Sequence, residues 1–321
     1  MAVIGQDISQ AKRILDAGEL VAISTETVYG LAGNALNPVA VALIFETKNR
    51  PSFDPLIIHV PSLLIAENYV SEIPKPLRRL AEHFWPGPLT LLLPRKNKIP
   101  DIVTSGLDRV AVRVPDHRLT LELLSQLDFP LAAPSANPFG YISPTSPQHV
   151  DAQLGEKISY ILDGGKCKVG LESTIVGMEG DEIVVYRLGG LEISEIESLV
   201  GEVKVKSHSS SNPQAPGLLE SHYAPTKPFI LGDLNDLISA YQSRGVNYAV
   251  LSLSQTFSSL PAEKQIALSV NADLKEAATH LFSAMRALDQ SNAAVILAEL
   301  MPEEGLGKAI NDRLKRAATK G

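Results

Sequence analysis

The chain has 321 residues, 45% of them apolar and 20% charged, and its 29 Lys and Arg against 36 Asp and Glu give a net charge of −7. This composition excludes an intrinsically disordered chain, a collagen and a coiled coil, and the acidic balance argues against a broadly basic nucleic-acid-binding protein. No apolar run approaches the roughly 18 residues of a membrane helix. The N-terminus has no basic segment followed by an apolar one, so we expect no secretory signal.

The first half of the chain alternates helical periodicity with short apolar runs. The spacing predicts helices over residues 8–17, 39–48 and 75–83. Strands are expected over residues 20–24, 56–60, 89–93, 110–114, 131–133 and 183–186, and a further strand starts at 172–176. Because helices and strands interleave without a strict βαβ order, the pattern predicts an α/β fold with a mixed sheet.

The segment 207–217 reads SHSSSNPQAPG and has the composition of a linker. A second α/β pattern follows, with strands over 229–231, 248–253 and 293–298 and helices over 234–243, 274–288 and 308–317. We therefore expect a first domain over 1–200, a linker over 201–228 and a second domain over 229–321. The sequence GLGK at 305–308 resembles part of a phosphate-binding loop, but it lacks the remaining residues of that motif and favours the start of a helix.

The single cysteine, Cys167, excludes an internal disulfide and any metal site built from several cysteines. It favours a reducing cytoplasm as the protein's location. Lys168 would lower the pKa of this thiol, but we favour an unreactive thiol that is exposed or half-buried. Because the seven histidines never fall at the spacing of metal ligands, we predict no protein metal site.

Polar residues follow the predicted strands at several places. STETVYGL, residues 24–31, comes directly after the first strand, where α/β folds bind ligands, although Thr25 or Thr27 would also suit the cap of a helix. Lys48 and Arg50 either complement a helix dipole or clamp phosphate oxygens. Arg113 lies in the apolar run VAVRV, where an unpaired charge would be costly.

The loop PSANP, residues 134–138, and the hydroxyl of Ser143 after it supply donors suited to sugar or phosphate groups. Arg187 ends another strand, whereas His59 lies inside an apolar strand, where a lone histidine is more often a core residue. These segments contain no thiol nucleophile and no carboxylate pair. The residues therefore suit the binding and orientation of a triphosphate and an amino acid, since adenylyl transfer depends largely on positioning and charge neutralisation.

Taken together, these segments resemble the threonylcarbamoyl-AMP synthase family, which carries a YrdC-like domain. The resemblance covers residues 8–191 and is carried by STETVYGL, KNRP…PLIIHV, WPGPLTLLL, VAVRVP, APSAN, DGG, ESTIV and YRLGG. The linker, the HYAP sequence at 222–225 and the second α/β pattern are similar to the long, two-domain members. The resemblance implies a twisted mixed-sheet catalytic domain followed by a smaller Rossmann-like domain.

The resemblance also implies a reaction, in which L-threonine, bicarbonate or CO2 and ATP give threonylcarbamoyl-AMP and pyrophosphate. The family's product serves the threonylcarbamoyladenosine modification of tRNA, through a downstream transferase of the Kae/TsaD type. Mg2+ would accompany ATP, tRNA would be the pathway's acceptor, and no membrane is involved.

Site roles follow from the same resemblance. Lys48 and Arg50 would be catalytic and would neutralise phosphate charge. Arg109 is a weaker candidate for a phosphate contact, Tyr223 of the linker would close over the site, and Asp54 stands where the family often has Asn. The residues implied to hold threonine are Thr27, His59, Arg113, Ala133 and Ser173. The residues implied to hold the nucleotide are Lys48, Arg50, Asp54, Arg109, Ser135, Asn137, Ser143, Arg187 and Tyr223.

Three alternatives stand beside this hypothesis, and a structural protein with a degenerate site is the one that the presence of Lys48, Arg50, Ser135 and Asn137 argues against. One is an RNA-binding or regulatory module with a YrdC-like fold, which the net charge of −7 weakens. Another is a carbamoyl-transfer factor of hydrogenase maturation, which contains a similar domain together with zinc fingers of the Cys-x-x-Cys type. The single cysteine excludes such fingers here.

Overall fold

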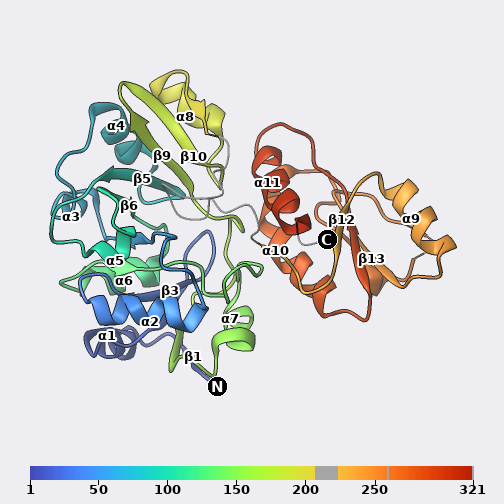
Figure 1. Cartoon of the computed structure of the whole chain (residues 1–321), viewed down its shortest axis with the longest axis horizontal. Helices are drawn as coiled ribbons and strands as arrows, with labels where there is room; N and C mark the ends of the chain where they lie inside the picture. Colours follow the sequence, from blue (N-terminus) through green and yellow to red (C-terminus); the bar gives the residue numbers. More distant parts are fainter. Residues whose placement is uncertain (207–222, 259, 320–321) are drawn as a thin grey trace.

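The computed structural model describes residues 1–206, 223–258 and 260–319. Most of the expected linker, residues 207–222, therefore lies outside the described residues. The described residues form a larger α/β unit from the N-terminal part of the chain and a smaller one from the C-terminal part (Figure 1). None of the helices in the described ranges is long and apolar enough to cross a membrane.

The larger unit is built on a mixed sheet with the strand order β1-β8-β2-β3-β7-β4-β6-β5-β9-β10-β11. The sheet contains both parallel pairs, such as β4 with β6, and antiparallel pairs, such as β5 with β6, as the irregular sequence order predicted. The strands are β1 Val3–Gly5, β2 Val21–Ile23, β3 Gly30–Asn34, β4 Ile57–His59, β5 Leu89–Pro94, β6 Arg109–Arg113, β7 Leu131–Ala132, β8 Tyr160–Leu162, β9 Thr174–Glu179, β10 Glu182–Arg187 and β11 Lys204–Val205.

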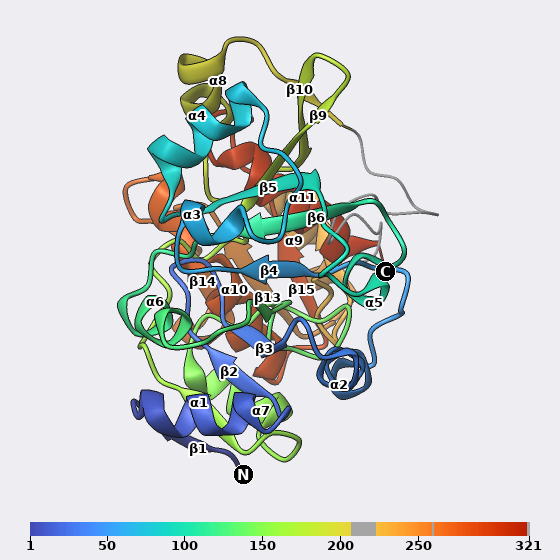
Figure 2. The same cartoon turned by 90° about the vertical axis from the view of Figure 1, so that its left-hand side faces the viewer.

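Helices flank this sheet, as Figure 2 shows from the side. Their ends follow local sequence signals: Asp7 caps the first helix, and Asn37 followed by Pro38 starts the second. Asn49 ends the second helix in a left-handed conformation, with φ 52° and ψ 41°. The helices are α1 Ile8–Asp16, α2 Pro38–Lys48, α3 Leu63–Ala66, α4 Lys75–Phe84, α5 Asp101–Thr104, α6 Arg118–Ser125, α7 Pro147–Leu154 and α8 Ile193–Val200.

The smaller unit has a parallel four-stranded sheet of order β12-β15-β13-β14, with α10 and α11 on the side that faces the larger unit (Figure 1). The GLGK segment starts α11 at Gly307, as expected. The elements are β12 Phe229–Leu231, α9 Leu234–Ser243, β13 Tyr248–Ser252, a 3₁₀ turn Ala262–Lys264, β14 Gln265–Ala267, α10 Leu274–Gln290, β15 Val295–Ala298 and α11 Gly307–Ala318.

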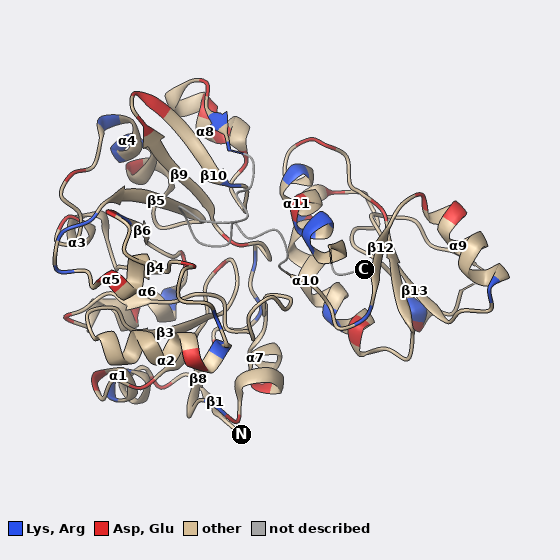
Figure 3. Ribbon diagram, viewed as in Figure 1, with Lys and Arg blue, Asp and Glu red and all other residues tan. Residues whose placement is uncertain are grey.

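The two units share one of the hydrophobic clusters of the structure, and each unit has further clusters of its own. Val28, Ile142 and Leu171 of the larger unit pack in the same buried cluster as α10 and α11. Acidic and basic residues are interspersed along both units rather than separated by sign (Figure 3). Burial of apolar area, rather than charge attraction alone, therefore holds the units together.

Candidate active site

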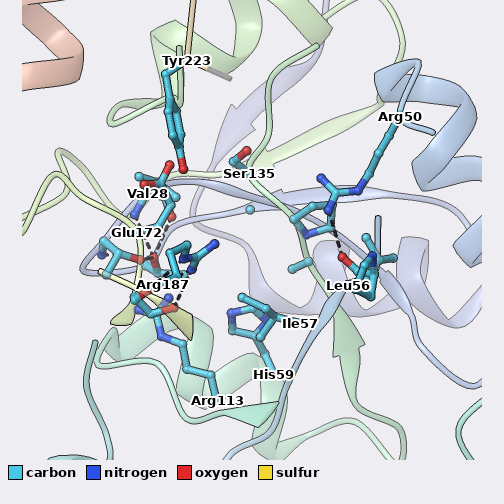
Figure 4. A pocket seen from close by; sticks show the side chains of 17 residues that line it. Val28, Arg50, Leu56, Ile57, His59, Arg113, Ser135, Glu172, Arg187 and Tyr223 are labelled. Carbon is cyan, nitrogen blue, oxygen red and sulfur yellow. Dashed lines mark hydrogen bonds between the residues drawn. The ribbon is translucent and has the colours of Figure 1, made fainter. Parts of the chain in front are cut away.

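A pocket lies against one face of the larger sheet, and Figure 4 shows its side chains. Arg113 and Arg187 lie on one side of the space, Arg50 lies on the opposite side, and Tyr223 directs its hydroxyl toward it. The cavity has a volume of about 60 Å³. Its lining residues are Thr25, Thr27, Val28, Gly30, Arg50, Pro55, Leu56, Ile57, His59, Arg113, Ala133, Pro134, Ser135, Glu172, Ser173, Arg187 and Tyr223.

The floor of the pocket is strand β4. Ile57 and His59 are two residues apart, so their side chains point to the same face of the sheet. Arg113 pairs with His59 in the parallel register of β4 and β6, which brings the imidazole beside the guanidinium. The backbone N–H of Ala133 donates to the Ile57 carbonyl at 3.1 Å and seats the next loop at the same place. The pocket therefore lies across a sheet face rather than only at strand ends.

Arg113 is buried and already paired. Its Nη2 lies 2.6 Å from Oε1 of Glu26, and its Nε donates to the Gly87 carbonyl at 3.2 Å. Oε2 of Glu26 accepts from the backbone N–H of Asp116 at 3.0 Å. The cost of burying the guanidinium is thus offset by a carboxylate of the chain, and the pairing holds the guanidinium beside the pocket.

His59 is a neutral imidazole. Burial and the neighbouring Arg113 lower its pKa to about 3. Its Nδ1 has no hydrogen-bond partner among the described residues. A buried polar atom without a partner in a cavity wall is a natural contact for a ligand group.

The hydroxyl side of the pocket comes from the turn after β2. Thr25 Oγ1 contacts Thr27 Oγ1 at 2.8 Å and donates to the Val28 carbonyl at 2.6 Å. The same oxygen accepts from the backbone N–H groups of Thr27 and Val28 at 3.2 Å. Neither threonine caps a helix, because strand β3 follows the turn.

Lys48 and Arg50 have different surroundings. Arg50 lines the pocket, and its Nη2 contacts Oδ2 of Asp54 at 2.9 Å while its Nε and Nη2 donate to the carbonyls of Asp54 and Pro55. Lys48 does not line the pocket, and its Nζ donates to the backbone carbonyls of Ser135 and Asn137. Burial and the nearby Arg50 lower the pKa of Lys48 well below its ordinary value. Lys48 thus ties the end of α2 to the loop that carries Ser135.

The opposite wall is a hydrogen-bonded chain of polar side chains. Arg187 donates to the carbonyl and to Oγ of Ser173, at 2.9 Å and 3.1 Å from Nη2. Ser173 Oγ also contacts Thr90 Oγ1 at 2.7 Å. Burial lowers the pKa of Arg187 to about 10, which leaves the guanidinium charged at neutral pH. The neighbouring Glu172 accepts from the Ser143 hydroxyl at 2.6 Å.

The structure brings most of the predicted site residues together. All five residues implied to hold threonine line the pocket, as do Arg50, Ser135, Arg187 and Tyr223. Four other predicted residues do not line the pocket but contact residues that line it or the loop that carries Ser135. They are Lys48, Asp54, Asn137 and Ser143.

Arg109 does not line the pocket. It begins β6, whereas Arg113 ends that strand, and four residues of extended chain separate them by about 13 Å. Its Nη1 donates to Oη of Tyr186 at 2.9 Å.

Two acidic residues of the site carried no predicted role. Glu26 lies in the STETVYGL segment and Glu172 in the ESTIV segment, and both segments were predicted to belong to the site. Their ion-pair partners, Arg113 and Arg313, are distant in the sequence, so no local pattern indicated these pairs. Cys167 is buried, contrary to the expectation of an exposed or half-buried thiol. Burial raises its pKa to about 12, and Lys168 does not lower it. The described residues hold no group of three or more His, Cys, Asp or Glu placed to bind a metal ion.

Comparison with known proteins identifies the family. A family model described as "Telomere recombination" matches residues 13–189, and one described as "Threonylcarbamoyl-AMP synthase, C-terminal domain" matches residues 191–319. A threonylcarbamoyl-AMP synthase of Pyrococcus abyssi is 40% identical over 314 residues, covering 94% of this chain and 91% of the relative.

The chain belongs to the threonylcarbamoyl-AMP synthase family.

Other members of the family match at a similar level. The threonylcarbamoyl-AMP synthase of Bacillus subtilis is 39% identical and covers 97% of this chain and 92% of its own. A crystal structure titled P. abyssi Sua5 complexed with L-threonine superposes with a TM-score of 0.92 at 38% identity, covering 99% of this chain and 97% of that one. The structure of E. coli YciO shares the fold of part of the chain. It superposes with a TM-score of 0.53 at 21% identity, and the match covers 59% of this chain and 96% of YciO.

Proposed function

We propose that the pocket joins L-threonine, bicarbonate-derived CO2 and ATP into threonylcarbamoyl-AMP and pyrophosphate. Membership of the threonylcarbamoyl-AMP synthase family over nearly the whole chain supports the reaction. The observation that carries the assignment to this pocket is the convergence of Arg50, Arg113 and Arg187 on one cavity beside the neutral His59. Such a set neutralises anionic substrates without a nucleophile.

The half of the pocket around β4 suits an amino acid. We place the threonine carboxylate at Arg113, which Glu26 and the Gly87 carbonyl hold in position. The unpartnered Nδ1 of His59 would contact the threonine hydroxyl, and Thr27 and Ser173 would contact the amine or the carbamate. Since His59 stays neutral, it adds no charge that would compete for the carboxylate.

The nucleotide needs more space than the cavity offers. A volume of about 60 Å³ is far below the roughly 300–1,000 Å³ typical of ligand pockets. We propose that Tyr223 moves aside when ATP enters, returns over the bound substrates and excludes water from the labile adenylate. Arg50, Arg187 and Ser135 would then face the phosphate groups.

Mg2+ would enter as part of the MgATP substrate. The carboxylates of Glu26, Asp54 and Glu172 each form an ion pair with an arginine. This pairing lowers their affinity for a metal cation. We therefore assign the ion to the phosphate oxygens, where it would neutralise charge.

The chemistry then needs two bond-forming steps. The threonine amine attacks CO2 and loses a proton to give a carbamate, and a carbamate oxygen attacks the α-phosphorus as pyrophosphate leaves. The chain's residues orient these groups and neutralise the charge that develops on the phosphates. We propose a downstream threonylcarbamoyl transferase of the Kae/TsaD type as consumer of the product, with tRNA as the final acceptor and the cytoplasm as the compartment.

Pyrophosphate release tests the proposal. The purified chain is incubated with ATP, Mg2+ and bicarbonate, with and without L-threonine, and compared with Arg50→Ala and with Arg78→Ala, which breaks only the surface pair with Glu67. We expect release that requires both threonine and bicarbonate, falls at least 100-fold in Arg50→Ala and is unchanged in Arg78→Ala. Release that ignores threonine, or no release by a folded chain, would contradict the proposal.

A further inference from the structure

Helix α11 of the smaller unit places Arg313 behind the wall of the pocket, against residues that line it. Arg313 is fully buried, and its Nη1 donates to the Leu188 carbonyl at 2.7 Å and to Asp312 Oδ2 at 2.8 Å. Its Nε and Nη2 donate to Oε2 of Glu172 at 3.2 Å and 3.1 Å. A residue of the second unit therefore contacts a residue that lines the pocket.

Glu172 is held from both units. Oε1 accepts from the Ser143 hydroxyl, and Oε2 accepts from Arg313. Burial raises the pKa of Glu172, but Arg313, Arg187 and Ser143 outweigh burial, so its pKa lies below the ordinary value. Removal of Arg313 would leave a buried carboxylate without its main counter-charge, and such a group moves or takes up a proton.

The same guanidinium also contacts Tyr223. Its carbon lies 5.3 Å from the centroid of the tyrosine ring, and that of Arg316 lies 4.8 Å from it. On α10, Phe282 stacks on Tyr223 with centroids 5.4 Å apart and an interplanar angle of 26°. Cation–π and stacking contacts of this kind favour one position of the ring.

We infer that Arg313 is a positioning residue, which couples the closed position of Tyr223 to the placement of Glu172 in the pocket wall. The inference rests on the proposed function of the pocket and extends it, because it gives the C-terminal unit a task in the reaction. Arg313 touches neither threonine nor the reacting phosphate in this scheme. It fixes two residues that line the pocket, Glu172 of the larger unit and Tyr223 of the expected linker.

Arg313→Met and Arg313→Lys test this inference. We expect Arg313→Met to lower kcat for threonine-dependent pyrophosphate release at least 30-fold. The KM for threonine should change less than threefold, because Arg113 and His59 lie on β6 and β4, away from α11. Arg313→Lys keeps the charge and should restore at least a fifth of the wild-type kcat.

Arg286→Met provides the matched control. Arg286 is also a buried arginine that crosses the boundary, from α10 to the carbonyls of Ile142 and Ser143, but it contacts neither Glu172 nor Tyr223 in the described structure. We expect its loss to lower the melting temperature as much as Arg313→Met does, with kcat within threefold of wild type. Equal losses of kcat in the two variants would mean that Arg313 only holds the units together, and would overturn the inference.

A binding measurement separates this inference from the proposed function. By calorimetry, Arg313→Met should weaken the binding of a non-hydrolysable ATP analogue at least tenfold, whereas Arg286→Met should not. A wild-type chain that shows this difference but makes no threonine-dependent pyrophosphate would contradict the proposed function alone. Unchanged kcat and unchanged analogue binding in Arg313→Met would overturn the role of Arg313.

Discussion

Asn49 separates the surroundings of Lys48 and Arg50. Its left-handed backbone ends α2 and turns the chain, so that the lysine reaches the carbonyls of the 134–138 loop while the arginine faces the pocket. The family resemblance implied one phosphate clamp made of both cations. The structure places a single cation of the pair in the pocket and uses the other to hold a loop.

His59 makes stability depend on pH. In the unfolded chain its pKa is near 6.5, and in the folded chain it is about 3, so the unfolded state binds more protons between these values. Stability therefore falls as the pH falls below about 6.5. Between about pH 7.5 and pH 5.5 the loss from this group is about 1.4 kcal/mol.

Urea denaturation at the two pH values measures this effect. His59→Gln should reduce the difference in unfolding free energy between the two pH values by about 1.4 kcal/mol. Ile57→Val lies on the same strand and does not titrate. It should lower stability by about 1 kcal/mol at both values, and the wild-type pH difference should persist in it. A His59→Gln variant with the full wild-type difference would exclude His59 as its source.

At the scale of elements, Gly189 allows the turn after β10 to lie close against the residues that precede β9. A Cβ at this position would lie 2.3 Å from the Glu172 carbonyl oxygen and 2.4 Å from the Ser173 carbonyl carbon. Both contacts are backbone atoms of the pocket wall. The glycine is therefore required by close approach of two chain segments.

Gly189→Ala should lower the free energy of unfolding by about 2–3 kcal/mol and should also lower activity, because the clash displaces Glu172 and Ser173. Gly232→Ala is the control, since the nearest atoms to its Cβ would be side-chain carbons of Leu237, at 3.2 Å and beyond, and this side chain can move. Chemical denaturation and pyrophosphate release measure both effects. If the two alanine variants lose the same stability and the same activity, the close approach at Gly189 does not determine the position of Glu172 and Ser173 in the pocket wall.

The sequence predicted some elements with their bounds and missed several short strands. The helix 234–243 and the strand 229–231 have the predicted bounds, and α10 extends the predicted helix by two residues. Strands β1, β8 and β14 have three residues each, too few for a periodic signal, and β3 reads GLAGN, which has little β propensity. β1 and β8 pair with each other across most of the larger unit's sequence, and β3 pairs with the distant β7 as well as with the adjacent β2.

The same distinction applies to the site. Polar residues next to predicted strands, together with the family resemblance, indicated most of the pocket lining, whereas the local pattern alone favoured a core role for His59. The partners of Glu26 and Glu172 depend on the register of β6 and on the docking of α11, and neither is visible in local sequence. Arg109 was predicted to contact phosphate but lies away from the pocket. It begins strand β6, whereas Arg113 ends the same strand beside the pocket.

At the scale of the whole molecule, the shared core predicts one unfolding transition. Leu171 of the larger unit is fully buried in the cluster that contains α10 and α11. Trp85 is the single tryptophan and packs in the larger unit, so its fluorescence reports that unit, whereas far-UV circular dichroism reports the helices of both. The two signals should give the same midpoint in urea.

Leu171→Ala tests the coupling between the units. It should lower the common midpoint by an amount equivalent to about 3 kcal/mol. If the fluorescence and circular dichroism transitions already separate in the wild type, the shared core does not make the chain a single cooperative unit.

The contacts between the units also constrain how the family can recombine. A gene fusion that joins this first half to the second half of a distant member would bring a foreign residue to the carboxylate of Glu172 and to the ring of Tyr223. Positions 28, 142, 171 and 172 on one side and 286 and 313 on the other must match within one chain. A chimaera of this first half with another member's second half should therefore lose stability, and it should regain stability when both faces of the boundary are exchanged together.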